Sequence, residues 1–195
     1  MTKLYLAMSE AIAIASQRHE DHGEWAVDVQ LVGSQPQCLA LDRHRPQRVY
    51  CGTFDQGLWR SDNAGASWEH VGAGIAQQAV TAVAVSLTER AGDHGVVYVG
   101  TEPSRLYRSE DGGSTWRELS ALRQLPSAPT WGLPDRPSIS HVRWITPDPL
   151  VAGRLFVAIE AGALLRSLDG GQTWEDRKPS GPYDTHTLVM HRLAP

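Results

Sequence analysis

The sequence predicts an all-β fold built from four copies of one repeat. Short runs of β-branched and aromatic residues, such as Arg48–Thr53 and Val96–Thr101, are separated by clusters of Gly, Pro, Asp and Ser. No stretch keeps a helical periodicity for longer than two turns. The pattern returns every 45 to 58 residues, a period typical of solenoids, propellers and arrays. Because each repeat divides into four short antiparallel strands, we expect the blades of a β-propeller.

Three of the copies align without gaps. In each, an aromatic residue is followed eleven residues later by Ser and eighteen residues later by Trp. These copies begin at Val49, Val97 and Leu155. A weaker copy begins at Leu4 and reaches its Trp, Trp25, after two extra residues.

The repeats divide the chain into predicted blades of a single domain, residues 1–195. The blades span residues 35–72, 79–119 and 139–177, and the first repeat, residues 3–34, is completed by residues 183–191. The third of the aligned copies is expected to form strands at Ile139–Thr146, Arg154–Ile159, Leu164–Ser167 and Thr173–Asp176. The other innermost strands are expected at Gln37–Leu41, Val80–Leu87 and Thr185–Met190.

Two arrangements of these blades remain open. In a closed ring, the last strand, Thr185–Met190, would complete the N-terminal blade and protect both edges. Four blades make a tight ring, and bulky residues such as Trp144 and Met190 fit poorly on tapered inner strands. We therefore favour an incomplete larger propeller over a four-bladed ring. An open fan of this kind would expose apolar blade faces and self-associate.

Composition excludes several classes of partner. The formal net charge is −4, and Lys and Arg are scattered, so we expect neither nucleic acid nor a membrane surface as partner. Glu10 interrupts the apolar N-terminal stretch, which does not resemble a signal peptide, and a cytoplasmic location is expected. Cys38 and Cys51 lie on neighbouring predicted strands, but without an export signal reduced thiols are favoured over a disulfide. No cofactor and no metal are expected.

The turns between the third and fourth strands resemble the Asp-box, S-x-D-x-G-x-T-W, of the bacterial neuraminidase repeat. Its carboxylate can accept N–H bonds across the turn, its Gly can adopt the positive φ that the turn requires, and its Trp can bury a large surface against the next blade. Asn63 departs from the pattern but keeps an acceptor oxygen. The matching residues are Ser61, Asn63, Gly65 and Trp68; Ser109, Asp111, Gly113 and Trp116; and Ser167, Asp169, Gly171 and Trp174.

The resemblance extends to the broad group of neuraminidase-type repeat propellers, which includes sialidases, sortilin-like receptor domains and photosystem II assembly factors. It implies a peripheral, structural Asp-box. The Arg-Ile-Pro signature of sialidases is absent, and among arginines only Arg143 lies on a predicted inner strand. We therefore expect a non-enzymatic binding or scaffold module for a protein, small-molecule or carbohydrate ligand. The alternative is a sialidase-like glycoside hydrolase.

Candidate site residues are those that a propeller would present on its channel face. Glu102 and Glu160 are the carboxylates that a hydrolase would use, provided that they flank a pocket. Ligand-binding candidates are His141, Arg143, Asp184, His186, Asp55 and Arg105. A metal site around His141, Asp184 and His186 is a weaker alternative. Trp131, in a Pro-rich connection, would either anchor a partner or pack down over the blades.

Overall fold

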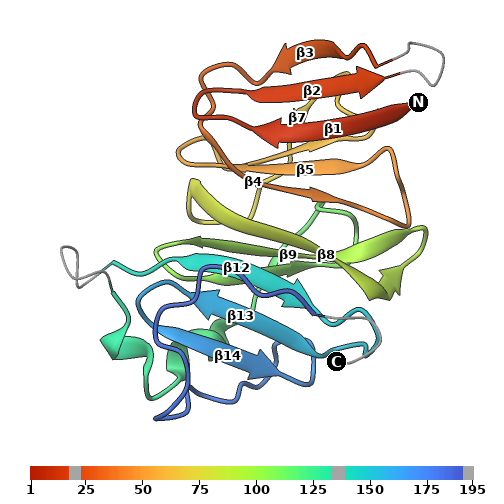
Figure 1. Ribbon diagram of the computed structural model, residues 1–195. Helices are drawn as coiled ribbons and strands as arrows, with labels where there is room; N and C mark the ends of the chain where they lie inside the picture. Colours follow the sequence, from red (N-terminus) through yellow and green to blue (C-terminus); the bar gives the residue numbers. More distant parts are fainter. Residues whose placement is uncertain (18–22, 133–138, 191–195) are drawn as a thin grey trace.

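The chain folds into four antiparallel β-sheets (Figure 1). The computed structural model describes residues 1–17, 23–132 and 139–190. Within these ranges, helix is restricted to two short 3-10 turns, Ser120–Gln124 and Ala128–Thr130. The all-β prediction is therefore confirmed.

The strands of each sheet follow one another in sequence order, as in successive hairpins. Sheet 1 contains β1 (Thr2–Ala7), β2 (Ile12–Gln17) and β3 (Ala26–Gln30). Sheet 2 contains β4 (Pro36–Leu41), β5 (Val49–Thr53), β6 (Leu58–Ser61) and β7 (Glu69–His70). Sheet 3 contains β8 (Ala79–Ala91), β9 (His94–Glu102), β10 (Leu106–Ser109) and β11 (Arg117–Glu118). Sheet 4 contains β12 (Val142–Pro147), β13 (Leu155–Ile159) and β14 (Ala163–Ser167).

The sheets are arranged in sequence order, with sheets 1 and 4 at opposite ends of the molecule (Figure 1). Strand β8 contacts both β4 and β12, and β4 also contacts β1. The first strands of sheets 2, 3 and 4 therefore converge, and we refer to β4, β8 and β12 as the inner strands.

Each inner strand carries a β-bulge near its beginning. The pairing with the second strand shifts at Gln37 in β4, at Thr81 in β8 and at Arg143 in β12. A bulge leaves one residue out of the ladder and redirects its side chain. The same local irregularity thus places three different polar side chains at equivalent positions.

Apolar side chains fill the space between neighbouring sheets. Ile12 of sheet 1 packs in one cluster with Cys51 of sheet 2, and Tyr50 of sheet 2 packs with Val97 of sheet 3. A third cluster joins sheets 3 and 4 and includes the buried Trp131. Of the two alternatives for that tryptophan, packing over the sheets is the one observed. The core therefore holds the sheets to one another.

The box tryptophans pack toward the preceding sheet, whereas the sequence analysis expected the following one. Trp68 of sheet 2 belongs to the cluster that includes Ile12 of sheet 1. Trp116 of sheet 3 donates its indole N–H to the carbonyl of Val71, 2.7 Å away. Trp174 joins the cluster between sheets 3 and 4. In each of sheets 2, 3 and 4, one tryptophan therefore packs in the interface with the preceding sheet.

The three box turns share one hydrogen-bonding scheme. In the turn after β10, the hydroxyl of Ser109 donates to Asp111 Oδ1 and accepts the N–H of Gly113, both at 2.8 Å. Asp111 Oδ1 also accepts the N–H of Thr115 at 2.8 Å. The glycines whose N–H groups bind the serine hydroxyls, Gly65, Gly113 and Gly171, have φ of 89°, 91° and 87°, a conformation that favours glycine.

These hydrogen bonds stabilise the ionised form of the box carboxylates. Partial burial acts to raise the pKa of Asp111, but hydrogen bonds from Thr115 and Ser109 outweigh it and lower that pKa to about 2. Hydrogen bonds from Thr173 likewise lower the pKa of Asp169 to about 2. Both carboxylates are engaged within their own turns.

The C-terminal segment differs from its expected position. Residues 185–190 do not form a strand with sheet 1. They lie on sheet 4, where the carbonyl of Leu188 accepts hydrogen bonds from Trp144 Nε1 at 3.0 Å and Thr146 Oγ1 at 2.9 Å. Sheet 1 therefore has three strands, and β1 lies at its edge. Cys38 and Cys51 are free thiols, as expected.

Candidate functional site

A groove with a volume of about 410 Å³ runs along the inner strands. It is lined by β4, β8 and β12 together with Ala7 of β1, and the bulged residues Gln37, Thr81 and Arg143 are among its walls. Thr81 is buried and donates its hydroxyl to the carbonyl of Val142 at 2.7 Å. The side chain of Arg143 is 42% exposed, so its guanidinium can meet a ligand.

A group of charged side chains lies beside Arg143, and we call it the carboxylate cluster. Its members come from the ends of β9, β12 and β13 and from the C-terminal segment. These strand ends meet because β12 pairs with β13 and contacts β9. They are Glu102, His141, Arg143, Glu160, Asp184 and His186.

Glu160, which directly follows β13, is the centre of the cluster. Its Oε2 lies 2.6 Å from His141 Nε2 and 3.6 Å from Arg143 Nε. Its Oε1 lies 3.8 Å from His186 Nε2. The Glu160 side chain is 20% exposed, so one carboxylate bridges the inner strand and the C-terminal segment at the protein surface.

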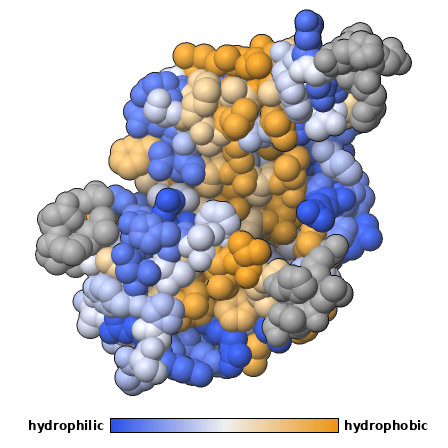
Figure 2. Space-filling view, in the orientation of Figure 1, coloured by the Kyte–Doolittle hydropathy of each residue, from blue (hydrophilic) through white to orange (hydrophobic). Residues whose placement is uncertain are grey.

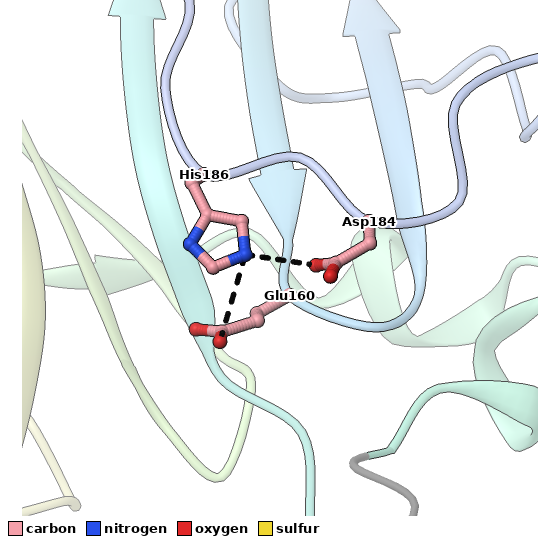
Figure 3. Close-up of side chains that lie close together, drawn as sticks. All are labelled: Glu160, Asp184 and His186. Carbon is pink, nitrogen blue, oxygen red and sulfur yellow. Dashed lines mark ion pairs between the residues drawn. The ribbon is translucent and has the colours of Figure 1, made fainter.

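Asp184 and His186 approach Glu160 from the C-terminal segment (Figure 3). His186 Nε2 lies 3.3 Å from Asp184 Oδ1. The backbone N–H of Ala161 donates to the same oxygen and lowers the pKa of Asp184, so this carboxylate is ionised at neutral pH. The side chains of Asp184 and His186 are 53% and 55% exposed and face solvent.

Glu102 approaches from the other side of His141. Its Oε2 lies 3.4 Å from His141 Nδ1, so one imidazole ring stands between the carboxylates of Glu102 and Glu160. Both carboxylates are largely buried at this contact. The two residues that a hydrolase would use thus meet the same histidine.

The cluster has two chemical capabilities. Its three carboxylates outnumber the single guanidinium, so it attracts a cationic group. In addition, Glu160, Asp184 and His186 each offer one ligand atom, and these atoms all lie within 4.8 Å of one another. Carboxylate oxygen and imidazole nitrogen form a donor set that suits a divalent cation such as Zn²⁺.

Two candidate residues lie outside the cluster. Arg105 pairs with Glu118 of β11, with its Nη1 3.0 Å from Glu118 Oε1. Asp55 is exposed in the loop between β5 and β6. The grouping of His141 with Asp184 and His186 also changes, because His141 contacts Glu160 and Glu102 instead.

Gln37 and Thr81 were missed by the sequence analysis. Both stand at the position of Arg143 when the inner strands are aligned, and that alignment is the signal that would have found them. The candidate residues were selected mainly for their charge, so these two neutral residues were not selected.

Comparison with solved structures identifies the fold. An ancestral GH74 enzyme matches 92% of the chain with a TM-score of 0.63 and 17% identity, and the match covers 22% of that enzyme. The GH74 enzyme of Niastella koreensis matches 86% of the chain with a TM-score of 0.48 and 16% identity, over 34% of its own length. A structure of YCF48 bound to a D1 peptide matches 87% of the chain with a TM-score of 0.42 and 14% identity, over 79% of its length.

The chain therefore has a β-propeller fold, with four antiparallel sheets of three or four strands. It spans about a fifth of the length of the first of these enzymes and a third of the second. No protein-family model matches the chain, and no curated protein gives a significant match. The helical segments of the described residues are two short 3-10 turns, and neither has the length or the hydropathy of a membrane span.

Proposed function

We propose that the chain is a non-enzymatic binding module that holds a basic segment of a partner protein against the carboxylate cluster. The observation that carries this proposal is the convergence of Glu102, Glu160 and Asp184 beside the inner-strand groove, with Arg143 as the one guanidinium. A Lys or Arg side chain of the ligand would meet Glu160 and Asp184. The groove would receive the adjoining residues of the peptide.

The geometry favours binding over hydrolysis. A glycoside hydrolase needs one carboxyl group free to protonate the leaving oxygen and a second to act as base or nucleophile. Here Glu102 and Glu160 both lie against His141, and Glu160 also faces Arg143 and His186. A glycoside hydrolase acting on a carbohydrate ligand is the alternative function, suggested by the likeness to GH74 enzymes.

Peptide binding can be tested by fluorescence anisotropy with two libraries, one with a central Arg or Lys and one with Gln at that position. We expect binding of the basic library alone, weakening as salt rises because exposed charges are screened. Glu160→Gln should weaken binding by about tenfold, or about 1.4 kcal/mol. The matched control is Glu118→Gln, which removes the same charge from sheet 3 outside the cluster.

The enzymatic alternative is tested on the same protein with sialosides, aryl glycosides and xyloglucan. We expect no turnover. Turnover that Glu102→Gln and Glu160→Gln both abolish would overturn the binding proposal in favour of a hydrolase. Equal affinity for the basic and Gln libraries, or equal effects of the Glu160 and Glu118 variants, would also overturn it.

A further inference from the structure

The outer face of sheet 1 is apolar and exposed. Its side chains come from alternate positions of β1 and β3 that lie in register across β2, so they project on one side. The opposite face, which includes Ile14, packs toward sheet 2. Figure 2 shows hydrophobic residues at this end of the molecule and down its middle. The large apolar residues of the outer face, 47% to 62% exposed, are Leu4, Leu6, Val27 and Val29.

Sheet 1 also has an unpaired edge. In sheets 2, 3 and 4, the second strand lies between an inner strand and a third strand. By the repeat alignment, β1 is equivalent to these second strands, because Tyr5 matches Tyr50. Among the described residues, β1 pairs with β2 alone. Its free edge can therefore accept another strand.

Trp25 indicates that a neighbouring sheet can also pack on the outer face of sheet 1, a position that we call the vacancy. It stands directly before β3, as Trp68 stands before β7 and Trp116 before β11. The latter two indoles are partly buried in the interface with the preceding sheet. Trp25 is 40% exposed, because no described sheet precedes sheet 1. The repeat pattern thus predicts that a further sheet packs on the outer face of sheet 1.

At the other end of the molecule, residues 183–190 occupy the place of an inner strand. In each of sheets 2, 3 and 4, the loop after the second strand donates a backbone N–H to a carbonyl three residues before the bulge position of the following repeat. These pairs are Gly57 N to Gln78 O at 2.9 Å, Ser104 N to Ser140 O at 2.8 Å, and Gly162 N to Tyr183 O at 2.9 Å. The segment thus follows β12 as β12 follows β8. Among the described residues it pairs with no second strand, and its Val189 is 85% exposed.

We propose that a second copy of this chain occupies the vacancy, and that two copies close into a ring of eight sheets. Residues 183–190 of each copy become the inner strand on β1 of the other. The outer face of sheet 1 then packs on sheet 4 of the other copy. A head-to-tail contact made twice around a two-fold axis closes the assembly and leaves no open edge.

Residues 183–190 of a second copy can pair with β1 more readily than residues 183–190 of the same chain. Sheets 1 and 4 lie at opposite ends of the molecule (Figure 1), and residues 183–190 already pack on sheet 4. Pairing within one chain would need that segment to leave Trp144 and Thr146. Pairing with a second copy keeps those contacts and adds a ladder. The three interfaces between sheets within the chain supply the pattern for the new one.

The first test is the mass of the native chain by sedimentation equilibrium. The chain has a mass of 21.4 kDa, and we expect twice that value. Val27→Glu should give the single-chain mass, because it places a charge in the new interface. Leu168→Glu is the control, at a residue of similar exposure in the turn after β14, where Gly170 lies near Tyr98 of sheet 3, and should leave the dimer intact. A native chain of single mass, or a dimeric Val27→Glu variant, would overturn the proposal.

The second test locates the exchanged strand. Aligned with β4 and β5, where Leu39 faces Cys51, the new ladder sets Leu188 opposite Leu6. Mild oxidation of the Leu6→Cys and Leu188→Cys variants mixed together should give a disulfide-linked dimer containing both chains. Native Cys38 and Cys51 can remain, because burial raises the pKa of both thiols.

A chain that carries both Leu6→Cys and Leu188→Cys distinguishes pairing within one chain from pairing between two copies. A disulfide within a single chain would show that the segment completes its own sheet 1, and would overturn the exchange. No disulfide in either experiment would also overturn it. Both readouts are independent of peptide binding, so the ring and the binding function can fail separately.

Discussion

Ser109→Ala should destabilise the protein by about 2 kcal/mol. The Ser109 side chain is almost fully buried, and its hydroxyl accepts the N–H of Gly113 and donates to Asp111, both at 2.8 Å. Its removal leaves a buried N–H without an acceptor, which costs about 1–3 kcal/mol. For a chain of this size, the midpoint of thermal unfolding should fall by about 4–8 °C. Circular dichroism at a strand-sensitive wavelength provides the measurement.

The control is Ser114→Ala in the same turn. The Ser114 hydroxyl is exposed and donates one bond, to the carbonyl of Asp111 at 3.1 Å. We expect a change of less than about 0.5 kcal/mol. Ser167→Ala, at the equivalent position of sheet 4, should match Ser109→Ala because it breaks the same bonds. The reasoning would be refuted if Ser109→Ala unfolded at the same temperature as Ser114→Ala.

Three further predictions follow from the packing and the turns. Because the pKa values of Asp111 and Asp169 are lowered, their ionised forms stabilise the fold above the usual pKa of about 4, and this stability is lost as the pH falls toward 2. The denaturant midpoint should therefore decline over that pH range, and it should decline less in the Asp111→Asn/Asp169→Asn variant. An identical decline in the two proteins would contradict this reasoning. Gly100→Ala would drive a methyl group into Val142 at the β9–β12 contact, and we expect the free energy of unfolding in urea to fall by about 1–3 kcal/mol; an unchanged midpoint would contradict the close packing. Cys51 is fully buried and its pKa is raised, so a thiol reagent should label it in urea but not in the native protein; rapid native labelling would disprove its burial.

Much of the fold could be predicted from the sequence because each repeat has residues of the same type at the same spacing. The spacing from aromatic residue to Ser to Trp marks the second strand, the turn and the start of the outer strand in sheets 2 and 3. In sheet 4 the expected strand Thr173–Asp176 is reduced to one bridge, between Arg166 and Glu175. The expected strand Leu164–Ser167 differs by one residue from β14, and Arg48–Thr53 differs by one from β5. Both differences lie at strand ends, where the last hydrogen-bonded pair, such as Ile159 with Ala163, sets the boundary.

Other features depend on contacts that no local pattern records. The bulge at Arg143 follows from how β12 pairs with β13, and the position of residues 183–190 follows from side-chain contacts such as that of Trp144. The convergence of Glu160 and His186 could be anticipated from equivalent repeat positions. The pairing of Arg105 with Glu118 could not, because it joins a loop to an outer strand across the sheet.

The bulges on the inner strands also bear on how such a chain can change its chemistry. Gln37, Thr81 and Arg143 stand outside the regular pairing of their sheets, so their identities are weakly tied to ladder stability. Sheets 2 and 4 thus each offer one exposed, replaceable side chain facing a shared groove, Gln37 and Arg143, whereas Thr81 is buried and hydrogen-bonded to Val142. Ligand preference can diverge, in evolution or by engineering, by exchanging Gln37 and Arg143 without redesigning the scaffold.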